Sequence, residues 1–261
     1  MILNLVLIGL FTGAITGITG ASGVLIIVPI LATLTDLPLH VILGTSLLVD
    51  VIASASVSFT YWRNKHVDLK RALWLLVGSL FGAQVGSFFA VSFSKLFILF
   101  AIAAGMLFFG FSMWRSGVTK KPPRFITLAE HHASYLHSPF AMVILGLLIG
   151  LSTGIFGAGG GLAIFIILYS FMRLPIKTAV GTSTFVMLLT ALSGVIGYVE
   201  YSNLDLKNGL IIGVAAALGG ALSAVFANRI NDEILAKLIG AFFIFLALVM
   251  LFLKVIAPIL S

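Results

Sequence analysis

The feature that most constrains the fold is a tandem duplication. The stretch GLFTGAITGITGASGVLII, residues 9–27, returns 137 positions later as GLLIGLSTGIFGAGGGLAI, residues 146–164. The same offset aligns the glycines of both stretches and then holds without a gap through three further motifs: residues 37–38, 44–46 and 68–70 match residues 174–175, 181–183 and 205–207. The chain therefore contains two copies of one unit, and we expect the functional site where the copies meet.

The composition places both copies in a membrane. Of the 261 residues, 61% are hydrophobic and only 9% are charged, whereas about a quarter of the residues of a soluble domain are charged. Apolar runs of about 18 residues or more recur along the chain, each long enough to cross a bilayer as a helix. Because backbone groups in lipid must bond internally, and because a barrel would show short alternating segments, we predict an all-α, multi-pass membrane protein.

Charge and cysteine content exclude several functions. The net charge of +7 comes from 15 Lys and Arg residues that lie almost entirely in loops, which is typical of cytoplasmic loops in membrane proteins and not of a nucleic-acid interface. The chain has no cysteine, so it has no disulfide, iron–sulfur cluster or thiolate zinc site, and we expect no cofactor. The first Lys or Arg is Arg63, so the start of the sequence is not expected to be a cleavable signal peptide.

Each copy begins with a punctuated apolar run and continues with three ordinary spans. The two runs cover residues 2–34 and 139–172 and are interrupted by glycine-rich tips. We therefore predict a first transmembrane repeat over residues 1–115, a cytoplasmic linker over 116–138 and a second repeat over 139–261. The six spans are expected near residues 41–62, 72–92, 96–114, 178–199, 208–228 and 235–256.

The punctuated runs allow two topologies. Each run is either a broken helix that crosses the membrane, which gives eight spans in parallel repeats, or a hairpin that enters and leaves on one side, which gives inverted repeats. The inverted arrangement places 12 Lys and Arg residues inside and 3 outside, whereas the parallel arrangement gives 10 and 5. Both satisfy the positive-inside rule, and the inverted arrangement satisfies it better.

The glycine tips are candidates for an anion site. Glycine leaves backbone N–H groups uncovered, and a helix that starts just after such a turn points free donors and a positive dipole end at a ligand. We assign this role to the clustered tip residues, and close helix packing to the glycines spaced four apart, Gly9, Gly13, Gly146 and Gly150. The candidate tip residues are Gly20, Ser22, Gly23, Gly157, Gly159 and Gly160.

A repeated hydroxyl pair follows each tip. Thr45 and Ser46 in the first copy correspond to Thr182 and Ser183 in the second, and both pairs lie near the start of an expected helix. Their hydroxyls can replace the water that hydrates an oxyanion, although serine and threonine in helices also often bond back to their own backbone. Their repetition in both copies favours a binding role.

These motifs resemble a known family. A repeated glycine-rich segment, followed by Leu-Pro and Gly-Thr-Ser, is similar to the sulfite exporter TauE/SafE family of anion permeases, and the resemblance covers nearly the whole chain. It implies a carrier, an exporter by its name, for sulfite, sulfonates or related sulfur-containing anions in a bacterial-type plasma (inner) membrane. One departure is Ile166, which stands where the first copy has Pro29, so the second arms of the two hairpins are expected to differ.

Asp50 is an acid placed well inside a span, between Val49 and Val51. A buried carboxylate in lipid suggests proton or cation coupling, and the alternative is a structural ion pair or a hydrogen-bonded protonated acid. Its counterpart in the second copy is Met187, so the acid is not part of the duplicated frame. Gln84 is a weaker polar candidate, for a hydrogen bond between helices.

Three other functions compete with a carrier. Residues 20–23 match the Gly-x-Ser-Gly nucleophile motif of rhomboid-type intramembrane proteases, but no histidine lies deep in a span to act as base. The sequence alone does not distinguish a passive anion channel from a carrier. A metal site at His131, His132 and His137 is less favoured than an interfacial helix.

We therefore predict a non-enzymatic transporter that works by alternating access. Proton coupling through Asp50 and assembly as a homodimer are further hypotheses.

Overall fold

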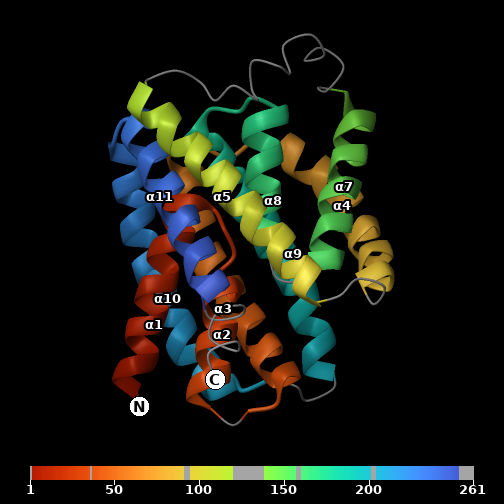
Figure 1. The fold of residues 1–261 in the computed structure, drawn as a ribbon, viewed down its shortest axis with the longest axis vertical. Helices are drawn as coiled ribbons and strands as arrows, with labels where there is room; N and C mark the ends of the chain where they lie inside the picture. The colour runs from red at the N-terminus through yellow and green to blue at the C-terminus, as the bar shows by residue number, and fades with distance from the viewer. Residues whose placement is uncertain are drawn as a thin grey trace.

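The computed structural model describes residues 2–35, 37–90, 95–119, 138–156, 160–200 and 204–252, and these are helical with short turns and contain no strand. The long helices stand side by side in one bundle (Figure 1). The first copy contains α1 (Ile2–Thr19), α2 (Val24–Leu34), α3 (Leu39–Arg63), α4 (Leu69–Ala90) and α5 (Lys95–Thr119). The second contains α7 (Pro139–Phe156), α8 (Gly160–Ile166), the π-helical η3 (Ile167–Phe171), α9 (Ile176–Glu200), α10 (Leu206–Arg229) and α11 (Asp232–Leu251).

The long helices confirm an all-α membrane fold. Each of α3, α4, α5, α9, α10 and α11 begins and ends within a few residues of an expected span. In the part of the chain that the structure describes, four segments are both long and apolar enough to cross a membrane: Ile2–Thr19, Val41–Arg63, Ile176–Val195 and Leu206–Arg229. Helix α5 runs on to Thr119, four residues into the expected linker, because no proline interrupts it before Pro122. Residues 120–137, which include the three linker histidines, lie outside the described residues.

The first punctuated run folds back on itself. Helix α1 ends at Thr19, and Gly23, at the start of α2, lies against the Thr12 side chain nearly two turns earlier in α1. Further along α2, Ile27 and Leu31 pack in one buried cluster with Leu5 near the beginning of α1. Helix α2 therefore returns alongside α1 and does not continue beyond it.

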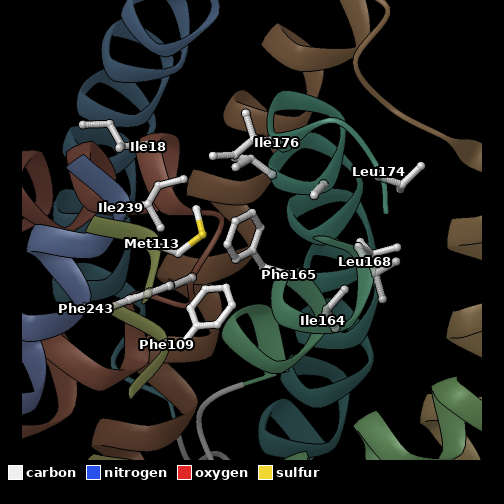
Figure 2. Close-up of a cluster of buried hydrophobic side chains, with 14 of the residues drawn as sticks. Ile18, Phe109, Met113, Ile164, Phe165, Leu168, Leu174, Ile176, Ile239 and Phe243 are labelled. Carbon is white, nitrogen blue, oxygen red and sulfur yellow. The ribbon is translucent and has the colours of Figure 1, made fainter. Parts of the chain in front are cut away.

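The second arms of the two runs differ. Helix α2 stays α-helical from Val24 past Pro29 to Leu34, whereas α8 ends at Ile166 and the chain continues as the π-helical turn η3. The ring of Phe165 in α8 packs against Phe109 of α5 and Phe243 of α11, at centroid separations of 5.8 and 6.4 Å. Figure 2 shows these three rings together in the main hydrophobic cluster. The sequence difference at Pro29 and Ile166 thus accompanies a real difference between the arms.

The two copies interlock. Helix α1 packs on α10 and, in the matching arrangement of the other copy, α7 packs on α4. Small residues line both contacts: a Cβ atom at Gly9 or Gly13 would collide with the α10 backbone, and one at Gly146 with the backbone at Leu75 of α4. The packing role assigned to Gly9, Gly13 and Gly146 is therefore confirmed, because these helices approach at backbone distance.

Two matching hydrogen bonds fix the direction of the central helices. The backbone N–H of Asp205 donates to the Thr45 hydroxyl near the start of α3, at 3.0 Å. In the other copy, the N–H of Asp68, just beyond the end of α3, donates to the Thr182 hydroxyl near the start of α9, also at 3.0 Å. Helix α9 therefore begins where α3 ends, and these neighbouring helices run in opposite directions. In Figure 1, α1 likewise begins at the bottom of the view and α7 at the top.

Candidate functional site

The first glycine tip is a tight turn. Gly20 has a φ of +69°, which only glycine adopts without strain, and its N–H continues the α1 ladder to the Thr16 carbonyl at 2.9 Å. The Thr19 hydroxyl then accepts from the N–H of Ala21 at 3.1 Å. These contacts end α1 and turn the chain into α2, as the glycine pattern predicts.

Asp50 holds the start of α2. Its carboxylate accepts a hydrogen bond from the Gly23 N–H at 2.9 Å and another from the Ser22 hydroxyl. The Ser22 oxygen in turn accepts from the N–H of Val24 at 3.2 Å. A carboxylate from α3 therefore lies at the positive end of α2, where an anionic group is favoured. The sequence flagged the tip and Asp50 separately, and the structure brings them together.

The first tip touches the second copy. A Cβ atom at Gly161, in the first turn of α8, would lie 2.7 Å from the Gly20 carbonyl oxygen and 2.9 Å from the Ser22 nitrogen. From α9, the Ser183 hydroxyl oxygen lies 3.4 Å from the Gly20 carbonyl oxygen, which is a longer contact than the one to its own helix at Val180, 2.9 Å away. Backbone from both hairpins therefore meets in the buried centre of the bundle.

Met187 occupies the position in α9 that Asp50 occupies in α3. Its sulfur would lie 2.6 Å from a Cβ atom at Gly161, so it too faces the start of the second arm of its hairpin. A thioether is only a weak acceptor and carries no charge. The duplicated frame thus presents a carboxylate at one tip and a neutral sulfur at the other.

The other predicted site residues lie around these tips. Gly160 begins α8, and Gly157 and Gly159 lie outside the described residues. The hydroxyls of Thr45, Ser46 and Ser183 donate to carbonyls of their own helices, at Val41, Leu43 and Val180. Thr182 and Thr45 also accept the bonds between copies described above. Binding of an anion by these hydroxyls stays a prediction and requires them to exchange partners.

A model of the family described as "Sulfite exporter TauE/SafE" matches residues 5–250. The chain belongs to the sulfite exporter TauE/SafE family. It is 30% identical over 241 residues to the probable membrane transporter protein YdhB of Bacillus subtilis, covering 90% of this chain and 94% of that protein. It is 26% identical to YunE of the same organism, also a probable membrane transporter protein, over 88% of this chain and 89% of that one. No solved structure matches the chain.

A probable membrane transporter protein of Xylella fastidiosa (strain Temecula1 / ATCC 700964) is 31% identical to this chain, over 85% of this chain and 84% of that protein. Together with the apolar helices, the family match identifies a multi-pass membrane transporter.

Sequence reasoning missed three buried hydroxyls near Asp50 in this TauE/SafE protein. Thr12, Thr16 and Ser54 are at most 1% exposed, and their hydroxyl oxygens have no hydrogen-bond partner. The available signal was spacing, because Thr12 and Thr16 lie one turn apart on α1, and Asp50 and Ser54 lie one turn apart on α3.

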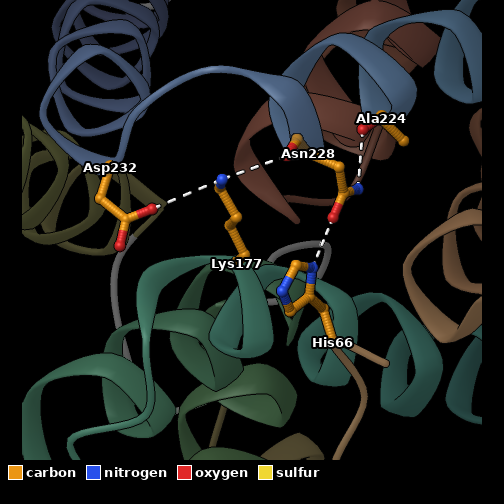
Figure 3. A network of polar contacts seen from close by, with 5 residues as sticks. All are labelled: His66, Lys177, Ala224, Asn228 and Asp232. Atoms are coloured by element: carbon orange, nitrogen blue, oxygen red, sulfur yellow. Dashed lines mark hydrogen bonds and ion pairs between the residues drawn. The ribbon is translucent and has the colours of Figure 1, made fainter. Parts of the chain in front are cut away.

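A second polar cluster lies at the end of the bundle where α3 ends and α9 begins. The Nδ1 atom of His66 is 2.5 Å from the Asn228 side-chain oxygen, and Lys177 donates to the Asn228 carbonyl at 3.1 Å and lies 3.7 Å from Asp232 (Figure 3). This cluster ties the loop after α3 to the end of α10 and the starts of α9 and α11.

Nothing in the described geometry assembles a hydrolytic site. The Ser22 hydroxyl donates to Asp50, while His66 contacts Asn228. The side chain of His40 and the three linker histidines lie outside what the structure describes. Among the described residues, no group of three His, Cys, Asp or Glu side chains could hold a metal ion.

Proposed function

We propose that this TauE/SafE protein is a carrier that exports a small sulfur-containing oxyanion, such as sulfite or an organosulfonate, across a bacterial plasma membrane by alternating access. The single observation that carries the proposal is the meeting of the two hairpins, where Gly161 of the second copy lies against Gly20 and Ser22 of the first. Transporter sites of this kind form near the middle of the bilayer, where broken helices from related repeats converge.

The direction of the helices supports inverted repeats. Helices α3 and α9 occupy matching positions and run in opposite directions, as the two hydrogen bonds between the copies require. We infer that the copies are related by an axis in the membrane plane. In that arrangement one copy can rock against the other, and the substrate between the tips is exposed to each side in turn.

The two tips contribute unequally to the proposed anion site. At the first tip, the N–H groups of Gly20, Ala21, Gly23 and Val24 already have acceptors within the protein. At the second tip, Met187 supplies no carboxylate to compete with an anion. We therefore place the anion nearer to the second tip, with Gly157, Gly159 and Gly160 as the expected backbone donors and the Ser183 hydroxyl as a further donor.

The test is uptake of radiolabelled sulfite by proteoliposomes. A carrier gives saturable uptake that is accelerated by unlabelled sulfite on the opposite side, whereas a passive channel shows neither saturation nor counterflow. Inside-out membrane vesicles should accumulate sulfite if the direction is export. Competition by sulfonates and not by neutral or cationic solutes is expected, and strong inhibition by a cation would contradict the anion assignment.

Two variants link this activity to the tips. Gly161→Ala places a methyl group against Gly20 and Ser22, so we expect uptake to be lost. Ser183→Ala removes one hydroxyl without a collision, and a lost net hydrogen bond of about 0.5–1.5 kcal/mol corresponds to a KM about 2- to 12-fold higher. Gly105→Ala is the matched control, because a methyl group there meets open space. Full uptake by Gly161→Ala would contradict the placement of the site.

A further inference from the structure

The three unpartnered hydroxyls beside the first tip are unusual for this chain. In helices, serine and threonine commonly donate to a backbone carbonyl three or four residues earlier. Buried polar groups without a partner are rare and call for an explanation such as a bound ion or water. Among the described residues, seven other threonines do bond back in the ordinary way: Thr19, Thr35, Thr45, Thr60, Thr119, Thr184 and Thr190.

The hydroxyls line one seam between α1 and α3. On α3, Asp50, Ser54 and Tyr61 fall on one face. The two ends of this face contact the first hairpin, because Asp50 binds the Gly23 N–H and Tyr61 donates to the Gly17 carbonyl at 2.9 Å. Ser54 therefore lies between these two contacts, buried on this face of α3.

The other two hydroxyls approach the seam from α1. Thr12 packs against Gly23, so it lies beside the residue that Asp50 holds. Thr16 lies one turn further along α1, immediately before Gly17. Thr12 and Thr16 therefore approach the seam at the level of Asp50 and Ser54, and the four side chains form what we call the seam cluster.

The seam cluster carries a carboxylate with no recorded partner of opposite charge among the described residues. Asp50 is 2% exposed, and its recorded contacts are the neutral donors Ser22 and Gly23. Among the described residues, the recorded ion pairs are Arg71 with Asp68 and Lys177 with Asp232, and neither involves Asp50. A carboxyl group buried in a membrane is either protonated or balanced by a counter-charge, and the unpartnered hydroxyl oxygens beside Asp50 favour a bound counter-charge.

We propose that Asp50, Thr12, Thr16 and Ser54 form a binding site for a single alkali-metal cation of about the size of sodium. Carboxylate and hydroxyl oxygens are the ligands that hard cations prefer. One carboxylate balances one positive charge, which fits a monovalent ion and not Ca²⁺ or Mg²⁺.

The position of the seam cluster suggests a coupling role, which rests on the proposed function. A cation bound to Asp50 fixes the carboxylate that holds Ser22 and Gly23, and Ser22 lies against Gly161 at the contact between the tips. Cation binding in the first copy can therefore set the shape of the site in which the second copy binds the anion.

The experiment compares purified protein in NaCl, KCl and choline chloride at equal ionic strength and without sulfite. We expect Na⁺ to raise the midpoint of thermal unfolding by roughly 5–10 °C at about 100 times its Kd, and ²²Na⁺ to bind with a stoichiometry of about one. Asp50→Asn and Thr12→Val keep the side-chain shape and should lose both responses. Ser170→Ala is the control, because it removes another buried unpartnered hydroxyl, in η3.

Each outcome is decisive. Equal midpoints in all three salts, or unchanged ²²Na⁺ binding by Asp50→Asn and by Thr12→Val, would overturn the cation site. Stabilisation by lower pH alone, with no preference among the salts, would overturn it in favour of a proton site. If ²²Na⁺ binds and no sulfur oxyanion is transported, the seam cluster stands and the proposed function fails. If sulfite is carried and ²²Na⁺ does not bind, the proposed function stands and the cation site fails.

Discussion

The two hairpin tips share a glycine-rich sequence and differ in electrostatics. In the first copy, a carboxylate at position 50 takes the Gly23 N–H and the Ser22 hydroxyl. In the second copy, a methionine at the matching position lies against Gly161. By contrast, the Thr–Asp bonds between the copies are retained on both sides, at 3.0 Å each. The hydrogen bonds between the copies are thus retained after duplication, while the side chains at positions 50 and 187 make one tip charged and the other neutral.

The largest expected effect comes from making the first tip like the second. Asp50→Met removes the acceptor of two buried donors, and each unsatisfied donor costs about 1–3 kcal/mol. We expect unfolding in detergent at a clearly lower temperature, together with loss of sulfite uptake. Met187→Leu is the matched control in the second copy, where a volume-conserving exchange should cost less than about 1.5 kcal/mol. Similar stability of the two variants would show that the tips are electrostatically equivalent.

The next effect tests the turn itself. Gly20→Ala forces a side chain into left-handed backbone, which costs about 1–2 kcal/mol, and its methyl group would also collide with the Ser183 hydroxyl of the second copy. We therefore expect a thermal midpoint at least several degrees lower. Gly105→Ala, in the middle of α5, should be neutral or stabilising by up to about 1 kcal/mol. A Gly20→Ala protein as stable as Gly105→Ala would indicate that the two tips do not press together as closely as the structure has them.

The first tip shows what could be predicted from sequence. The repeat offset, the apolar runs and the glycine spacing predict the long helices, the turn at Gly20 and the packing of Gly9 and Gly13. The bond from Asp50 to Ser22 joins residues 28 positions apart in different helices. No local pattern encodes such a contact, because it depends on where α2 lies after it turns back.

The hydroxyl pairs show the same limit. Their repetition singled out Thr45 and Thr182 for a binding role, which stays a prediction. The groups from which they accept, the N–H of Asp205 and the N–H of Asp68, are 160 and 114 residues away. Periodicity places these threonines near helix starts and does not reveal which loop of the other copy covers them. The extension of α5 to Thr119 was missed because polar residues marked a linker where helical bonding simply continues.

A matched pair of variants tests the retained scaffold. Thr45→Val and Thr182→Val each leave a backbone N–H, at Asp205 or Asp68, without its acceptor, at a cost of about 1–3 kcal/mol. Because the two sites lie at opposite ends of α3, we expect the losses to be similar and to add in the double variant. Differential scanning fluorimetry of the wild type, the two single variants and the double variant measures the midpoints of thermal unfolding. A loss confined to one variant would show that the scaffold is as unequal as the tips.

The smallest expected effect concerns an ion pair that only one copy can form. Lys177 lies 3.7 Å from Asp232, whose side chain is 61% exposed, and the matching residues of the first copy are His40 and Lys95, whose charges cannot make such a pair. Exposed pairs contribute about 0–1 kcal/mol and weaken in salt. Asp232→Asn should therefore lower the midpoint of thermal unfolding by no more than a few degrees in low salt and by less in high salt. The comparison variant is Asn228→Ala, which removes the contacts of Asn228 with His66 and Ala224. A large loss of thermal stability in Asp232→Asn that salt does not reduce would instead show that the two copies also differ in stability at this polar end of the bundle.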